Sequence, residues 1–114
     1  MSSLPNVLSI AGSDPSGGAG IQADLKTFAA LGCYGMAVIT ALTAQNTQGV
    51  SGVHIPPAEF VAQQIDAIFA DIEVSAVKIG MLGSPDVVEA VAQALKSKEV
   101  SSFLSGEGFE LDGN

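Results

Sequence analysis

Short apolar runs alternate along this chain with longer segments in which apolar residues recur at helical spacing. The short runs have apolar and β-branched centres, which is typical of strands buried on both faces of a sheet. Strands are predicted at residues 7–11, 34–42 and 74–79, with a short edge strand at residues 50–55. Helices are predicted at residues 21–31, at residues 58–72, and from Ser84 to the region of Lys96.

This order predicts an α/β fold with a mainly parallel sheet and flanking helices, because parallel neighbours need a crossover connection. Ligands bind such sheets beyond the carboxyl ends of the strands. Three segments are expected at that edge: residues 12–20, a polar loop at residues 43–49, and residues 80–83.

The pattern stops after about three strand–helix units. Residues 100–114 contain three glycines and no sustained apolar period. We therefore expect a domain over residues 1–99, followed by an irregular tail in which no fourth parallel strand forms.

Composition narrows the function classes. The 114 residues are 47% hydrophobic and carry a formal net charge of −8, with four lysines and no arginine. Nucleic-acid binding is not expected, because it depends on basic contacts to phosphates. The chain shows neither a membrane-spanning apolar run nor a basic leader, so we expect a soluble, cytoplasmic protein without a membrane partner. Its single cysteine, Cys33, excludes an internal disulfide.

The glycine-rich segment 12–20 joins the first strand to the first helix, where backbone N–H groups can approach a small or anionic ligand. It is not a P-loop, because Gly18 and Ala19 stand where a lysine and a hydroxyl residue are required. It is also too long for the tight turn of a dinucleotide site. Two interpretations stay open: a loop that lines a ligand, or a turn that needs glycine at positive φ.

Two polar side chains are candidates for ligand contact. Asp24 is placed in the first turn of the first helix, either as a solvated acid favoured by the helix dipole or as an acceptor for a ligand hydroxyl. Gln45 follows a buried strand, and its amide can pair with an amine beside a ring nitrogen, although a plain turn residue is equally consistent. Lys78 must find a partner or reach the sheet edge, and Met81 suits a core position.

Four stretches resemble the hydroxymethylpyrimidine/phosphomethylpyrimidine kinases of thiamine biosynthesis. They are GSDPSGGAGIQADLKTF at residues 12–28, LGCYG at 31–35, VITALTAQNT at 38–47 and VKIGML at 77–82. The motifs occur in the family's order, and the resemblance runs from about Asn6 to Leu95.

This resemblance implies a ribokinase-like fold and the use of ATP and Mg²⁺. The implied reaction phosphorylates the hydroxymethyl group of 4-amino-5-hydroxymethyl-2-methylpyrimidine, and then phosphorylates the monophosphate again. By the same resemblance, Gln45 reads the 4-amino group and Asp24 lies near the hydroxymethyl end. The ring pocket is then lined by Gly12, Ala19, Thr43 and Met81.

The resemblance also implies what is missing. Family members are typically more than twice this length, and their ATP site, phosphate-binding glycine motif and activating residue lie in the second half. We therefore expect no catalytic residue and no metal ligand in this chain, poor ATP binding, and no activity by the chain alone. The alternative is a non-catalytic module that binds the pyrimidine or forms homo-oligomers through an uncompleted sheet edge.

Overall fold

The computed structural model describes residues 4–100 and 102–104. Strands and helices alternate along this part of the chain. In order they are β1 (Asn6–Ser13), α1 (Gly20–Ala30), β2 (Tyr34–Asn46), β3 (Gly49–His54), α2 (Ala58–Phe69), β4 (Ala76–Ile79), α3 (Pro85–Lys96) and β5 (Ser102–Leu104). None of the helices in the described residues has the length and apolar character needed to cross a membrane.

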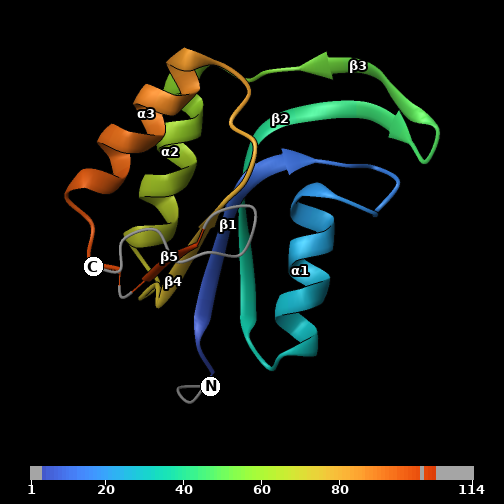
Figure 1. Cartoon of the computed structure of the whole chain (residues 1–114). Coiled ribbons are helices and arrows are strands. Elements are labelled where there is room, and N and C mark those ends of the chain that lie inside the picture. The colour runs from blue at the N-terminus through green and yellow to red at the C-terminus, as the bar shows by residue number, and fades with distance from the viewer. Residues whose placement is uncertain (1–3, 101, 105–114) are drawn as a thin grey trace.

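The strands form one sheet in the order β3-β2-β1-β4-β5. β1 pairs in parallel with both β2 and β4, β4 pairs in parallel with β5, and β3 joins β2 in antiparallel orientation at the other edge. Figure 1 shows α1 on one face of the sheet and α2 with α3 on the other. The expected α/β fold with a mainly parallel sheet is confirmed, as is the short edge strand.

The main core lies between the sheet and the α2–α3 pair. Fully buried side chains on the central strands contact apolar side chains of both helices. They are Leu8, Ile10, Val38 and Val77 on the sheet, and Val61, Ile65, Val87 and Val91 on the helices. The central strands are mostly apolar, as expected for strands with helices on both faces, and α1 covers their other face.

Local residues explain where α3 begins and where α1 ends. The hydroxyl of Ser84 caps α3 by accepting a hydrogen bond from the backbone N–H of Val87 at 3.2 Å, and Pro85 occupies the first helical position. Gly32 follows α1 with φ at 79°, the left-handed conformation that glycine tolerates at a helix end. Both ends agree with the sequence prediction.

The predicted loop at residues 43–49 is wrong for most of its length. β2 continues through Thr43 and Gln45 to Asn46, and pairs with β3 in a hairpin that projects beyond the sheet in Figure 1. Thr43 and Gln45 are half-buried while Ala44 and Asn46 are exposed. The polar residues thus alternate along a half-buried strand, and this polarity hid the strand from an argument that looked for apolar runs.

The expectation that no strand follows the last helix is also wrong. β5 runs parallel to β4, with Phe103 opposite Val77. Three residues are too few to show a period, so only the pairing with β4 reveals the strand. The boundary at residue 99 stays a prediction, and residues 105–114 of the expected tail lie outside the described residues.

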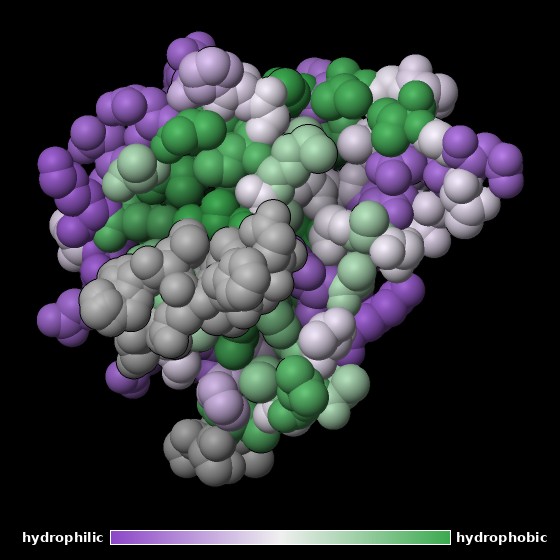
Figure 2. Space-filling view, in the orientation of Figure 1, coloured by the Kyte–Doolittle hydropathy of each residue, from purple (hydrophilic) through white to green (hydrophobic). Residues whose placement is uncertain are grey.

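In the part of the chain that the structure describes, β5 is the last strand at its edge of the sheet. Figure 2 shows hydrophobic side chains gathered at the surface over α2 and α3, on the side of the molecule that faces the viewer. Several apolar residues near this edge are only partly buried against the core, among them Leu82, Leu95, Val100 and Phe103. This edge therefore presents both strand backbone and apolar side chains that the described chain does not cover.

At the other side of the sheet, α2 completes the hydrogen bonding of β2. The side-chain amide of Gln64 donates to the carbonyl oxygen of Ile39 and accepts from its N–H, each at 2.9 Å. β3 pairs with β2 only from Leu42 onward, so Ile39 has no strand neighbour on that edge. A buried backbone group without a partner is costly, and Gln64 supplies the missing partner.

We expect Val87→Ala to destabilise the chain by about 1.5–3 kcal/mol, because Val87 is 1% exposed in the core and the substitution leaves a cavity. The neighbouring Val88 is 49% exposed, and Val88→Ala is the matched control with an expected effect below about 0.5 kcal/mol. Urea unfolding of the two variants measures the difference. Equal losses of stability would show that α3 does not pack as described.

Candidate functional site

A pocket of about 530 Å³ lies at the carboxyl ends of the strands, where the sequence predicts a ligand site. Its walls come from all three of the expected segments, together with β3. Five of the six predicted ligand residues line it: Gly12, Ala19, Thr43, Gln45 and Met81. Asp24 is not among the lining residues.

The glycine-rich loop is organised by a buried carboxylate. Asp14 is 3% exposed, and its side chain accepts hydrogen bonds from the N–H and hydroxyl of Ser16 at 2.9 and 2.7 Å and from the N–H of Gly18 at 3.1 Å. The amide of Gln22 connects the loop to α1, since it accepts from the Asp14 N–H and donates to the Ser13 hydroxyl. The loop is therefore an ordered turn in which the N–H groups of Asp14, Ser16, Gly17 and Gly18 already have partners.

The hydrogen bonds lower the pKa of the Asp14 carboxyl. The Ser16 hydroxyl is the largest cause of a lowered pKa for this carboxyl; burial opposes it, and the backbone N–H groups of Ser16, Ala19 and Gly18 lower the pKa further. The pocket wall thus carries a fixed negative charge at neutral pH.

Glycine is required where α1 begins. Gly20 has φ at 62°, and a Cβ atom at this position would lie 2.4 Å from the carbonyl oxygen of Gly12. The register between β1 and β2 also shifts between Ala11 and Ser13, so the strand bends at Gly12. Of the two interpretations of the loop, the need for positive φ is confirmed, and the loop lines the pocket as well.

Thr43 and Gln45 act together on the β2 side of the pocket. The hydroxyl oxygen of Thr43 lies 2.8 Å from the carbonyl oxygen of Ser13 and 2.9 Å from Oε1 of Gln45. A hydroxyl has one proton and can donate to only one of these acceptors, while a rotated Gln45 amide can donate back to the hydroxyl. In either orientation Thr43 holds the Gln45 amide against the pocket wall.

Apolar side chains form the outer wall. Val50, Val53 and Ile55 come from β3 and the segment after it, and Met81 comes from the loop after β4. Met81 is 75% exposed, so the core position suggested by its residue type is wrong. The hydroxyl of Thr40 donates to the Met81 carbonyl at 2.9 Å and fixes this loop to β2.

Asp24 lies behind the pocket and not in the first turn of α1, which contains no acidic residue. Its carboxylate forms an ion pair with Lys78, with Nζ 2.9 Å from Oδ2 and 3.1 Å from Oδ1. The buried Ser9 donates its hydroxyl proton to Oδ2 at 2.7 Å. The interpretation of Asp24 as a solvated acid is therefore wrong. The ion pair also provides the partner that was expected for a lysine in an otherwise apolar strand.

Sequence reasoning missed Asp14 and the apolar wall from β3. The run Asp-Pro-Ser-Gly at residues 14–17 is a turn signature in which the aspartate side chain accepts from the following N–H groups, and this signal was available. No comparable signal marks Val50 and Val53, because their place in the pocket depends on the hairpin that brings β3 back over β2.

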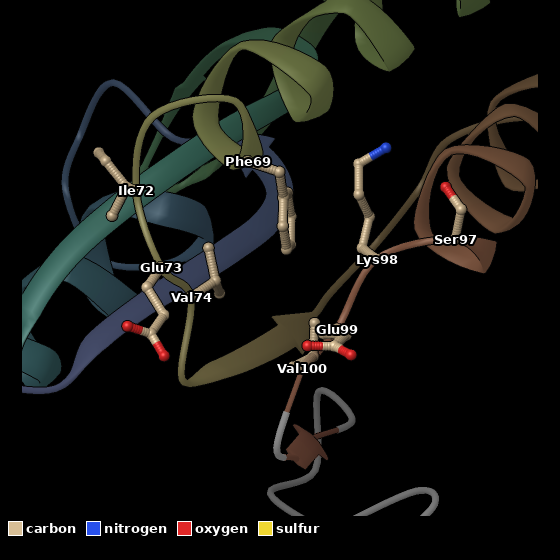
Figure 3. Close-up of a pocket in the computed structure, with 8 residues that line it drawn as sticks. All are labelled: Phe69, Ile72, Glu73, Val74, Ser97, Lys98, Glu99 and Val100. Carbon is tan, nitrogen blue, oxygen red and sulfur yellow. The ribbon is translucent and has the colours of Figure 1, made fainter.

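A second hollow, of about 660 Å³, lies at the other end of the sheet. Figure 3 shows its lining, which comes from the segments that follow α2 and α3, and the charged ends of Glu73 and Lys98 point in different directions. Lys98 is already paired with Asp66 at 2.9 Å. The polar groups do not converge on a common point, so this hollow is not the candidate site.

The part of the chain that the structure describes contains no cluster of metal-ligating side chains. Among residues 4–100 and 102–104, no three histidine, cysteine, aspartate or glutamate side chains come close enough together to hold an ion.

We expect the stabilising effect of Asp14 to depend on pH. Folding lowers the pKa of Asp14, so its negative charge stabilises the folded state at pH values above the unfolded-state pKa of about 3.9. This stabilisation is lost as the pH falls through the folded-state pKa. Urea unfolding at about pH 7 and about pH 2 should show Asp14→Asn less stable than the wild type only at the higher pH. Asp71→Asn, at an exposed loop position, is the control and should show no such change.

A family model described as phosphomethylpyrimidine kinase matches residues 14–104. The hydroxymethylpyrimidine/phosphomethylpyrimidine kinase of Escherichia coli strain K12 is 58% identical over 99 residues, which cover 87% of this chain and 37% of that protein. The thiamine biosynthesis multifunctional protein ThiED of Corynebacterium glutamicum is 60% identical over 97 residues, which cover 85% of this chain and 13% of that protein.

Solved structures of related kinases also match this chain. A crystal structure of phosphomethylpyrimidine kinase from Clostridium difficile 630 matches with a TM-score of 0.85 and 48% identity, over 94% of this chain and 49% of that chain. The pyridoxal kinase of Staphylococcus aureus in complex with AMP-PCP and pyridoxal matches with a TM-score of 0.79 and 36% identity, over 90% of this chain and 38% of that chain.

These findings confirm the family resemblance and the ribokinase-like fold. The chain spans less than half the length of each of these relatives. With a family model that covers residues 14–104, the chain belongs to the phosphomethylpyrimidine kinase family.

Proposed function

We propose that the pocket binds 4-amino-5-hydroxymethyl-2-methylpyrimidine or its monophosphate, and that this chain supplies the substrate-binding part of a hydroxymethylpyrimidine/phosphomethylpyrimidine kinase. The observation that carries the proposal is the convergence of Gly12, Ala19, Thr43, Gln45 and Met81 on one pocket. Its volume of about 530 Å³ is ample for a substituted single ring.

The chemistry of the walls suits such a ring. The Gln45 amide offers an acceptor and donors side by side, which match an exocyclic amine next to a ring nitrogen. The glycine loop lets the backbone approach one face of the ring, and Met81 with Val53 and Ile55 supplies apolar contact. Asp24 stays assigned to the hydroxymethyl end in this proposal, although in the free protein its carboxylate contacts Lys78 and Ser9.

The residues of this chain do not fit a site for ATP with Mg²⁺. The N–H groups of Ser16 and Gly18 in the glycine-rich loop already bind the Asp14 carboxylate, so they are not available to the phosphates of ATP. The one lysine that lines the pocket, Lys78, is engaged with Asp24, and the chain contains no arginine. Phosphoryl transfer requires positioned cations around the transferring group, so we propose that the chain binds substrate without turning it over.

Gln45→Ala should weaken binding of the pyrimidine alcohol by about 10- to 100-fold, because the ligand's amine and ring nitrogen lose their hydrogen-bonding partner. Isothermal titration calorimetry with the alcohol measures the loss. Gln48→Ala is the matched control, since Gln48 is an exposed glutamine in the turn of the same hairpin.

Equal binding by the two variants would remove Gln45 from this role. If the wild-type chain does not bind the alcohol at all, the proposed function is wrong. A second function, docking through the β5 edge, then becomes the stronger candidate, because within residues 4–100 and 102–104 no strand pairs with the outer side of β5 and apolar residues of the core are only partly buried.

The chain with Mg-ATP and the pyrimidine alcohol should form no phosphorylated product above the rate of a protein-free control. Chromatographic detection of the monophosphate provides the measurement. The kinase from Escherichia coli serves as the positive control for the assay. Turnover by the 114-residue chain would overturn the claim that it lacks a working phosphoryl-transfer site.

A further inference from the structure

A three-residue polar cluster lies where the pocket meets the face of the sheet that carries α1. Ser9 on β1 and Lys78 on β4 are register partners, so both side chains lie on that face. Asp24 reaches them from α1, and its carboxylate is held by the Lys78 ammonium and the Ser9 hydroxyl. The side chains of Lys78 and Asp24 are 19% and 16% exposed, so neither is freely solvated.

Only one charged member of this cluster faces the pocket. Lys78 lines it and Asp24 does not. The carboxylate therefore lies behind the ammonium as seen from the ligand, and a ligand substituent that reaches this corner meets the Lys78 side chain first.

A glycine keeps that ammonium accessible. Gly80 lies two residues after Lys78 and lines the same pocket. A Cβ atom on Gly80 would lie 3.4 Å from Lys78 Nζ and 2.9 Å from the Cβ of Ala11. A side chain at this position would clash with Ala11 and crowd the ammonium, so glycine keeps this side of Lys78 open to the pocket.

The number of N–H donors on the Lys78 ammonium also allows a contact with a ligand. An ammonium has three N–H donors. Within residues 4–100 and 102–104, Lys78 Nζ donates only to the two carboxylate oxygens of Asp24. One donor is left for an acceptor on the side where Gly80 leaves space.

The charges of Lys78 and Asp24 indicate which kind of ligand group can accept this hydrogen bond. The charge of Lys78 is balanced by Asp24, with which it forms an ion pair at 2.9 Å. A neutral oxygen can therefore accept a hydrogen bond from the ammonium without adding a charge to this corner of the pocket.

We propose that Lys78 donates a hydrogen bond to the hydroxymethyl oxygen of the bound pyrimidine and is a specificity-determining residue of the pocket. Asp24 and Ser9 are positioning residues that hold the ammonium in place, so Asp24 acts on the ligand through Lys78 and not by direct contact. This inference rests on the proposed function, because it takes the pyrimidine alcohol as the ligand.

The test compares two ligands that differ by one oxygen: the pyrimidine alcohol and 4-amino-2,5-dimethylpyrimidine, in which a methyl group replaces the hydroxymethyl group. Calorimetry should show the wild-type chain binding the alcohol about 10- to 100-fold more tightly, the range expected for a hydrogen bond to a charged donor. The paired variant Lys78→Met with Asp24→Asn removes the cation without leaving a carboxylate unpaired. It should bind both ligands with affinities within about threefold of each other.

A second variant keeps the ion pair. Gly80→Ala, combined with Ala11→Gly to remove the Cβ that would otherwise lie only 2.9 Å away, places a methyl group 3.4 Å from the ammonium, and it should lower the preference for the alcohol while Lys78 and Asp24 remain paired. A purely structural ion pair would leave the ratio of the two affinities unchanged in this variant. Urea unfolding of each variant identifies any that do not fold, and the other variant then decides.

The outcomes separate the two proposals. If the wild-type chain binds both ligands equally, or if both variants keep the full preference, Lys78 has no contact with the hydroxymethyl oxygen while the proposed function stands. If the wild-type chain binds neither ligand, the proposed function fails and this inference fails with it.

Discussion

The parallel pairing of β1 with β2 on one side and β4 on the other determines where every other part of the site can lie. This pairing buries β1 on both faces and brings the ends of three strands to one edge of the sheet. The chain must leave that edge and return to start α1, and it does so through Gly12 and Gly20, whose backbones approach too closely for a side chain at Gly20. The pocket is the space that this geometry leaves between the loop, the β2–β3 hairpin and the loop after β4.

The Asp14 carboxylate changes the chemical meaning of the glycine loop. A glycine-rich turn before a helix is a ready anion site when its N–H groups are free. Here an internal anion already binds those groups, as Ser16 and Gly18 donate to Asp14. These two N–H groups therefore have an internal partner and are not available to an external anion. The loop is suited to lie against a neutral ring, and this agrees with the absence of an unpaired cation among the described residues that line the pocket.

The sequence predicted the fold where one physical signal dominated. Apolar runs located the central strands, helical periodicity located α1, α2 and α3, and Ser84 marked the start of α3. Prediction failed where the signal was too short or mixed. β5 has only three residues, and the end of β2 alternates polar residues because Thr43 and Gln45 face the pocket. That second error is informative, because the residues that made β2 look like a loop are the ones that line the candidate site.

The candidate site divides in a similar way. Gln45, Thr43, Gly12, Ala19 and Met81 could be named because their motifs resemble those of a family, and each of them lines the pocket. The role of Asp24 could not be worked out from sequence, because it depends on a partner 54 positions away, Lys78, on a strand that becomes a neighbour only after the sheet forms. An ion pair of this kind costs desolvation on both sides and does little for stability compared with apolar packing. Its place beside Gly80 and the pocket gives a reason for it that stability alone does not, since a held ammonium can recognise a ligand oxygen with little loss of side-chain entropy.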